Sequence, residues 1–312
     1  MEPRCNLIID SCCDLPFDVV DRPGVDLIKF PYIQNGVEKI DDLYQSTTPK
    51  EFYDLMRDKK AQPPTTSQIP LQTLEDTFRR ALESKVPTVY IAFTSGLSGS
   101  FDMSEMVATN LAQEYPEGQL YLVDSQLASI AEGLLVYEAI AQREKGLSAQ
   151  EMVAWVEEAR YFVNSQFMVD DLDSLRRGGR IPANVAKAGA KLDVKPLMTF
   201  DLSGKLTLSG VARGRKKGIR QLQECYLKRY DPMQTTRQVV VAHADCPKDA
   251  QRLCEILERE DPGVLILESN IGPVIGSHVG PGMIAIVFWG PDRREDISVA
   301  DRIARRVKRG EA

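Results

Sequence analysis

Hydrophobic positions in the first half of the chain alternate between short apolar runs and longer segments with helical spacing. The short runs have the length and composition of buried strands, and apolar residues in the longer segments recur every three or four positions. The expected strands are 5–9, 25–31, 87–93 and 119–123. The expected helices are 48–57, 70–84, 100–113, 129–144 and 148–162. This alternation predicts a parallel sheet with helices on both faces.

The second half has a different pattern. Two short runs, 194–200 and 205–211, are joined by the turn-like residues 201–204, which predicts a β-hairpin. After the hairpin we expect a basic helix at 213–229, strands at 237–243, 263–268 and 283–289, and helices at 247–259 and 297–307. The change of pattern places a domain boundary between residues 160 and 170.

The length of 312 residues exceeds what one hydrophobic core usually serves, so two domains are expected. The predicted fold class is α/β. Residues 1–165 form a Rossmann-like domain with a parallel sheet and helices on both of its faces. Residues 166–312 form a second α/β domain.

Composition narrows the class of protein. The chain is 43% hydrophobic and 27% charged, as is usual for globular proteins. No apolar run approaches the ~18 residues of a membrane span, and the N-terminus lacks the features of a signal peptide. A cytoplasmic protein without stable membrane insertion is therefore expected. The six cysteines follow no metal-binding spacing and are expected to be reduced thiols. Cys12 and Cys13 fall in a predicted loop, where burial is favoured over reactivity.

Positive charge is concentrated in one segment. Residues 171–230 hold 14 Lys or Arg and 5 Asp or Glu, a balance of +9 in a chain whose net charge is −6. Such a basic segment either docks an acidic partner or a phosphate, or is simply a solvated face.

Two polar loops precede predicted helices, at 65–68 (Thr-Thr-Ser-Gln) and 94–100 (Thr-Ser-Gly-Leu-Ser-Gly-Ser). Hydroxyls and unpaired backbone N–H groups at helix N-termini favour anions. For either loop alone, simple helix capping is the alternative. We expect both loops at the same edge of the sheet, where ligands bind in open α/β folds.

His278 is one of two histidines and lies in residues 271–282, which contain four glycines and two prolines. Because Gly and Pro interrupt regular structure, this segment is expected to be a shaped loop rather than a helix or strand. Together with the two polar loops it suggests a single anion pocket. The other histidine, His243, is expected to be structural or to line the boundary between the domains.

Six motifs in order, spread nearly from end to end, resemble those of the DegV family. They are 10–16 (Asp-Ser-Cys-Cys-Asp-Leu-Pro), 66–68 (Thr-Ser-Gln), 94–100, 175–181 (Leu-Arg-Arg-Gly-Gly-Arg-Ile), 213–217 (Arg-Gly-Arg-Lys-Lys) and 276–282 (Gly-Ser-His-Val-Gly-Pro-Gly). The chain departs from the family pattern at Ile69-Pro70, where a hydroxyl residue is missing after the proline, and at Cys12-Cys13, which replaces small or hydroxyl residues. The family pattern is also varied at Thr94 and Ser100.

The resemblance implies a DegV-like two-domain fold that binds a long-chain fatty acid such as palmitate, with no other cofactor and no metal. Thr66 and Ser95 would bind the carboxylate with His278 as the third partner, beside Ser67 and Thr94. The acyl chain would enter a tunnel in the second domain, where each buried CH₂ contributes about 0.8 kcal/mol. The protein would be a non-catalytic carrier that presents the carboxylate to a separate ATP-dependent fatty acid kinase subunit.

The resemblance also gives the basic segment a role. Arg180, Arg213 and Arg215, with Lys216 and Lys217, would dock the kinase or attract the new phosphate. Arg180 could instead be an internal ion-pair anchor.

Other functions remain as alternatives. A serine hydrolase of acyl esters would use Ser95 or Ser98 with His278, although the second glycine of the loop comes one place too early for Gly-x-Ser-x-Gly. Nucleic-acid binding is opposed by the net charge and by the few aromatic residues in the basic segment. A kinase acting alone is not expected because the chain has no phosphate-binding Gly-x-x-x-x-Gly-Lys-[Ser/Thr] motif.

Overall fold

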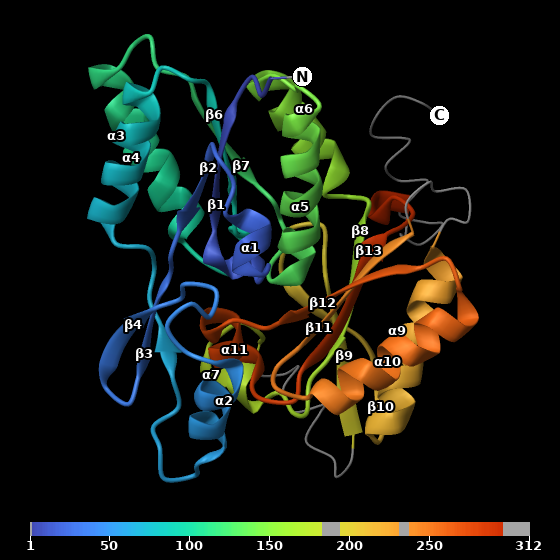
Figure 1. The fold of residues 1–312 in the computed structure, drawn as a ribbon. Coiled ribbons are helices and arrows are strands. Elements are labelled where there is room, and N and C mark those ends of the chain that lie inside the picture. Colours follow the sequence, from blue (N-terminus) through green and yellow to red (C-terminus); the bar gives the residue numbers. More distant parts are fainter. Residues whose placement is uncertain (1, 183–193, 231–236, 296–312) are drawn as a thin grey trace, which may run out of the picture.

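The computed structural model describes residues 2–182, 194–230 and 237–295, which form three sheets and their covering helices (Figure 1). The first sheet is parallel and has the strand order β2-β1-β6-β7. Its strands are β1 (Asn6–Asp10), β2 (Val25–Ile28), β6 (Thr88–Ala92) and β7 (Leu120–Asp124). All five residues of β6 are buried, as expected for a strand covered on both faces.

Helices cover both faces of this sheet, which confirms the prediction for the first half (Figure 1). Helices α3 (Leu71–Glu83) and α4 (Ser100–Glu114) pack on one face, and α5 (Ile130–Glu144) and α6 (Ala149–Ala159) on the other. A short helix α1 (Phe17–Val20) follows β1 and a turn of 3₁₀ helix at Ser11–Cys13.

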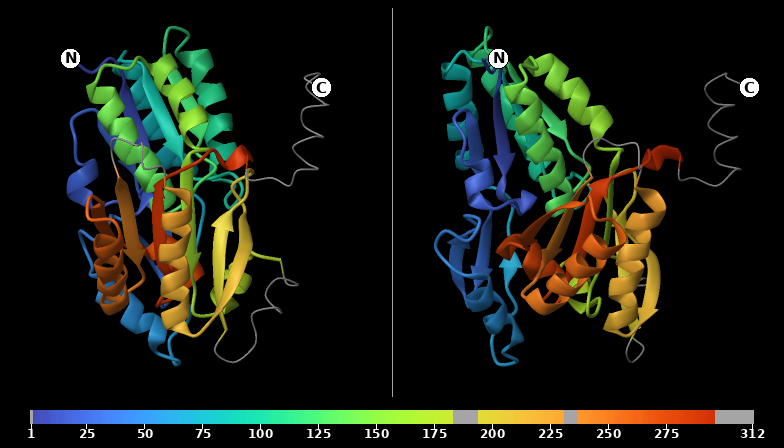
Figure 2. Two further views of the ribbon diagram at one scale, coloured as in Figure 1. Left: turned by 90° about the vertical axis from the view of Figure 1, so that its right-hand side faces the viewer. Right: turned by 45° about the vertical axis from the view of Figure 1, so that its right-hand side comes forward.

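The second sheet has the strand order β10-β9-β8-β13-β11-β12 and is largely antiparallel. Its strands are β8 (Val163–Met168), β9 (Val194–Phe200), β10 (Leu206–Arg213), β11 (Gln238–His243), β12 (Leu265–Asn270) and β13 (Ile284–Trp289). Helices α9 (Arg215–Arg229) and α10 (Pro247–Glu260) cover one face, while α5 lies against the other (Figure 2). The predicted hairpin is confirmed as β9–β10, and the predicted helix at 297–307 lies outside the described residues.

Strand β8 was missed by the sequence pattern, which assigned no strand between 162 and 194. Its central residues, Asn164, Ser165 and Gln166, are polar, so the segment has no apolar run. The strand nevertheless occupies the middle of the sheet, between β9 and β13. A domain division at residue 165 would fall inside β8, and one apolar core includes residues from both large sheets.

A third, small sheet corrects two predictions. Strand 25–31 was expected to be continuous, but the chain forms β2 and then β3 (Pro31–Gln34), which pairs with β4 (Val37–Ile40). Asn35 and Gly36 both have positive φ at the turn, the Asn-Gly signal of a two-residue hairpin. Residues Thr65–Thr66, expected to be a loop at the edge of the parallel sheet, form β5 and pair with β3 instead.

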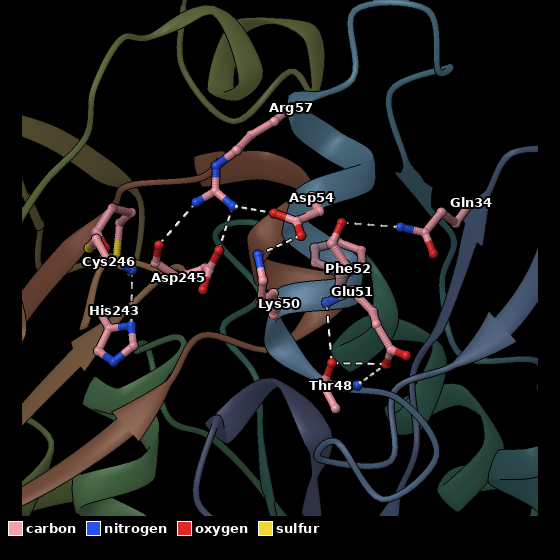
Figure 3. A network of polar contacts seen from close by, with 11 residues as sticks. Gln34, Thr48, Lys50, Glu51, Phe52, Asp54, Arg57, His243, Asp245 and Cys246 are labelled. Atoms are coloured by element: carbon pink, nitrogen blue, oxygen red, sulfur yellow. Dashed lines mark hydrogen bonds and ion pairs between the residues drawn. The ribbon is translucent and has the colours of Figure 1, made fainter. Parts of the chain in front are cut away.

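Helix α2 (Pro49–Arg57) lies between this small sheet and the loop that follows β11, and it makes polar contacts with both (Figure 3). The Thr48 hydroxyl and the Glu51 carboxylate form a capping box at its first turn. At its last turn Arg57 donates to the Asp245 carboxylate and, at 3.0 Å, to the Asp245 carbonyl. Asp245 follows β11, so this contact joins two segments that are 188 residues apart in the chain.

Candidate functional site

The segment that carries His278 is a helix, which corrects the prediction of an irregular loop. Helix α11 spans Pro273–Val279 and has Pro273 at its first position, where a proline costs no hydrogen bond. The helix ends at Gly280, whose φ is +77°. Gly276 is required inside the helix because a Cβ there would lie 2.4 Å from the Tyr53 hydroxyl oxygen. The glycines and prolines therefore delimit and pack a short helix rather than prevent one.

A cavity of about 350 Å³ lies beside α11, within the range of small-molecule sites. We call it the central cavity. It lies between the second sheet, the N-terminal end of α5, α11 and the loop that joins β6 to α4. Its apolar lining includes Phe30, Phe93, Leu97, Phe167, Leu175, Phe200, Leu206, Val274, Ile275, Val279 and Met283.

Polar side chains gather where α11 meets the loops, and we call this region the polar end. Its residues are Thr66, Ser67, Gln68, Ser98, Arg180 and His278. The Thr66 hydroxyl oxygen lies 2.8 Å from Nε2 of His278. Burial, with a smaller contribution from the Arg180 charge, lowers the pKa of His278 to about 4. His278 is therefore neutral at pH 7.

Gly178 sets the position of the imidazole. Helix α7 (Asp173–Arg177) ends at Gly178, and a Cβ on this residue would lie 2.1 Å from Nδ1 of His278. Arg180 then turns back, donating to the Gly178 carbonyl and, at 3.2 Å, to the Leu97 carbonyl. These contacts place one guanidinium, one imidazole and one hydroxyl at the same end of the central cavity.

Two buried carboxyls hold the N-terminal end of α11. Asp14 accepts a hydrogen bond from the Gly272 N–H at 2.9 Å, and Asp41 accepts one from the Val274 N–H at 3.3 Å. Burial raises the pKa of Asp41 to about 7, and burial together with the neighbouring Asp41 raises that of Asp14 well above its usual value. Sequence reasoning did not assign these roles, although Asp14 belongs to the first motif.

Ser95 and Thr94 do not line the central cavity. The Ser95 hydroxyl is exposed and donates to Asp124 at 2.6 Å. The buried Thr94 hydroxyl donates to the Gly204 carbonyl at 3.2 Å, which fixes the loop against the β9–β10 turn. Of the five residues expected at the carboxylate, the structure brings together Thr66, Ser67 and His278. Ser98 takes the place on the cavity wall that was expected for Ser95.

The serine hydrolase geometry is not formed among the described residues. Ser95 pairs with Asp124, and the Ser98 hydroxyl donates to Ser100 Oγ at 3.0 Å. His278 pairs with Thr66 instead of either serine. The proposed mechanism needs His278 within hydrogen-bond reach of the serine nucleophile, and His278 is paired with neither serine here.

The basic residues have different environments. Arg213, Lys216 and Lys217 are exposed. Arg215 is turned inward, forming ion pairs with Asp170 at 3.0 Å and with Asp249. Arg180 lines the cavity and forms no ion pair with a carboxylate of the described residues, so its interpretation as an internal ion-pair anchor finds no support.

The remaining chemistry-bearing residues have structural surroundings. Cys12 and Cys13 are buried, although Cys12 also lines the central cavity, and burial raises the pKa of both thiols well above the usual value, which agrees with the expectation of unreactive side chains. His243 accepts from the Cys246 N–H and lies 3.3 Å from Glu268. Within the described ranges no cluster of three or more Cys, His, Asp or Glu side chains has the arrangement of a metal site. None of the helices in these ranges combines the length and apolar character needed to cross a bilayer.

Comparisons with known proteins agree with this fold. A family model described as "Uncharacterised protein, DegV family" matches residues 4–290. A DegV domain-containing protein of Clostridium perfringens is 34% identical over 285 residues, which cover 91% of this chain and 97% of the relative. A similar protein of Streptococcus pyogenes is 30% identical over 291 residues, which cover 92% of this chain and 99% of the relative.

Solved structures give the same result. A DegV family protein from Thermus thermophilus, described as fatty acid binding, superposes with a TM-score of 0.80 at 29% identity, covering 92% of this chain and 100% of the other. DegV of Bacillus subtilis, described as a fatty acid binding protein, superposes with a TM-score of 0.79 at 25% identity, covering 93% of this chain and 100% of the other. The two large sheets, the central cavity and the six motifs thus occur together in a chain that belongs to the DegV family.

Proposed function

We propose that this protein binds a long-chain fatty acid, with the acyl chain in the central cavity and the carboxylate at the polar end. The observation that carries the proposal is the joining of an apolar cavity to one cluster of polar groups that includes the Thr66–His278 pair. The fatty acid binding described for the Thermus thermophilus and Bacillus subtilis proteins supports it.

The apolar lining provides the affinity. Each buried CH₂ contributes about 0.8 kcal/mol, so a long acyl chain has ample gross binding energy. This gain requires that the carboxylate be solvated by the protein, because burying an unpaired charge costs several kcal/mol. A ligand with an aliphatic chain and one anionic end therefore matches the distribution of polar and apolar side chains.

The polar end can satisfy a carboxylate. The Thr66 hydroxyl is a hydrogen-bond donor, the Ser98 hydroxyl can rotate from Ser100 toward the ligand, and Arg180 adds a positive charge. Gly99 also lines the cavity directly before α4, where the positive end of the helix dipole favours an anion. The neutral imidazole of His278 can donate through Nε2 to Thr66, which frees the Thr66 hydroxyl to donate to the ligand.

Delipidated protein titrated with palmitate tests the proposal. Thr66→Val should raise the Kd roughly tenfold or more, because a hydrogen bond to a charged group contributes about 1.5–3 kcal/mol. Ser95→Ala is the matched control, since Ser95 lies outside the cavity and should bind like wild type. Native mass spectrometry of freshly purified protein should show a bound fatty acid. Absence of both a bound lipid and palmitate binding would refute the proposal.

We further propose that the bound carboxylate is presented to a separate ATP-dependent fatty acid kinase subunit, which the DegV resemblance suggests. Arg180 stands at the polar end, and Arg213, Lys216 and Lys217 offer exposed positive charge for docking. Arg215 is omitted from the docking surface because Asp170 and Asp249 neutralise it.

Phosphorylation of bound palmitate by such a kinase, with ATP, tests the docking proposal. Arg213→Ala should slow phosphorylation and leave the palmitate Kd unchanged, because Arg213 is exposed and does not line the cavity. The effect should weaken at high salt, which screens exposed charges. Wild-type phosphorylation by Arg213→Ala, or an equal loss of lipid binding, would contradict the docking role.

A further inference from the structure

The second sheet is open at one place beside the central cavity. The ladder between β8 and β9 comprises the pairs Phe167–Met198 and Met168–Leu197. Both strands extend beyond it, because β8 begins at Val163 and β9 continues to Phe200. At the level of Ser165 the two strands are joined by a side chain instead, since the Thr199 hydroxyl donates to the Ser165 carbonyl at 2.6 Å.

Along β8, this opening lies farther from His278 than Phe167 and Met168 do, because Met168 pairs with Ile284, which follows α11 in the chain. Strand β8 ends at Met168 and is followed by α7, and Gly178 directly after α7 lies against the His278 ring. Ser165 lies two residues earlier than Phe167, about 7 Å farther from that end along the strand. Because β8 and β9 are antiparallel and Phe167 pairs with Met198, Phe200 is level with Ser165.

A second pocket begins at the opening. Its volume is about 250 Å³, and it shares Ser165 and Phe200 with the central cavity. Its other lining residues are mostly polar, and two of them lie on α9, so the pocket reaches past the sheet toward the helix layer. They are Asn164, Thr199, Asp201, Leu202, Cys225, Arg229 and Arg293. Phe200 is buried and lines both volumes.

Phe200 is held in this position from two sides. Its carbonyl accepts a hydrogen bond from Arg293 Nη1 at 3.2 Å, and its ring lies 6.3 Å from the ring of Phe167. Leu206 pairs with Phe200 across the hairpin and also lines the central cavity. The aromatic ring thus has a fixed backbone and a packed neighbour.

We propose that Phe200 closes the far end of the central cavity and thereby limits the length of the acyl chain that the cavity accepts. This proposal rests on the proposed fatty acid binding. Each added CH₂ increases the affinity until the acyl chain is long enough to reach Phe200. Longer chains meet the ring and gain no further affinity. The predicted gain is about fourfold in Kd for each buried CH₂.

The test measures Kd for saturated fatty acids from lauric to behenic acid. For wild type we expect Kd to fall with chain length up to a limit and then to level off or rise. Phe200→Ala should move this limit to longer chains, because it removes the ring from the cavity wall and leaves that volume to the acyl chain. Phe200→Leu should move the chain-length limit in the same direction by a smaller amount. This variant decides the test if Phe200→Ala does not fold.

Phe30→Leu is the matched control, because Phe30 is an aromatic residue that lines the same cavity and its ring packs against Phe93 rather than Phe200. It should weaken binding at all chain lengths and leave the limit where it is. Identical limits for wild type and the folded Phe200 variants would overturn the role of Phe200 while leaving fatty acid binding intact. No binding of any chain by wild type would instead refute the proposed function itself.

Discussion

Gly178→Ala tests the arrangement of the polar end with the smallest possible change. Gly178 has a φ of −72°, which alanine adopts without strain, so the backbone can remain in place. The new Cβ would nevertheless lie 2.1 Å from His278 Nδ1 and 2.9 Å from Cε1. Because ordinary contact begins at 3.4 Å, the imidazole must retreat by more than about 1 Å.

This retreat should separate His278 Nε2 from the Thr66 hydroxyl, which are now 2.8 Å apart. A lost hydrogen bond costs about 0.5–1.5 kcal/mol, and overpacking costs about 1–3 kcal/mol. If about 1.4 kcal/mol of this is expressed in binding, the Kd for palmitate rises about tenfold. Isothermal titration calorimetry with delipidated protein measures this change in the Kd for palmitate.

Gly179→Ala is the matched control. No atom lies within 4 Å of a Cβ at Gly179, but its φ is +71°, a conformation that costs other residues about 1–2 kcal/mol. This variant should therefore lose about 2–4 °C in Tm per kcal/mol and keep its affinity for palmitate. Unchanged binding by Gly178→Ala, or the same loss of binding in both variants, would refute the proposed constraint on His278.

Three further perturbations have definite expected outcomes. The pKa of His278 is lowered to about 4 in the folded state, so the stability that His278 contributes is present above pH 6.5 and is lost as the pH falls toward 4. Relative to His278→Gln, the free energy of chemical unfolding should fall by up to about 3 kcal/mol over this range. Parallel pH profiles for both proteins would contradict this. Asp14→Ala should weaken palmitate binding by releasing Gly272 of α11, whereas Asp14→Asn keeps an acceptor and should restore most of the affinity; equal affinities in the two variants would exclude this role. Arg57→Ala should lower the unfolding free energy by only about 1 kcal/mol, because the Arg57 side chain is 40% exposed, and a larger loss would show that the contact to Asp245 matters more than its exposure suggests.

The sequence alone predicted the helices and strands whose apolar positions recur with a clear period. The parallel sheet and its helices followed from apolar runs and helical spacing, and the β9–β10 hairpin from its turn residues. Strand β8 was missed because its centre, Asn164–Gln166, is polar, yet its neighbours in the sheet satisfy its backbone. Helix α11 was missed because Gly and Pro are poor helix formers, and tertiary contacts to Tyr53 and Asp14 override that preference.

The motifs grouped Thr66, Ser67 and His278 in one site, and the structure brings the three residues to the same cavity. Their role in binding a carboxylate stays a prediction. The motifs did not distinguish Ser95 from Ser98, because both are serines in one loop and only the fold decides which faces the cavity. The deciding contact is the Ser95–Asp124 hydrogen bond, which turns Ser95 outward and depends on the end of β7, a different strand.

The first motif, residues 10–16, contains two aspartates that hold the two segments meeting at the polar end. Asp10 accepts hydrogen bonds from the Phe93 N–H at 2.9 Å and the Tyr90 hydroxyl at 3.1 Å, so it fixes the start of the loop that carries Ser98. Asp14 fixes Gly272 at the start of the helix that carries His278. Each buried carboxyl thus holds one of the two segments that meet at the polar end. Neither aspartate lines the central cavity, so the first motif positions the two segments and adds no polar group to the polar end itself.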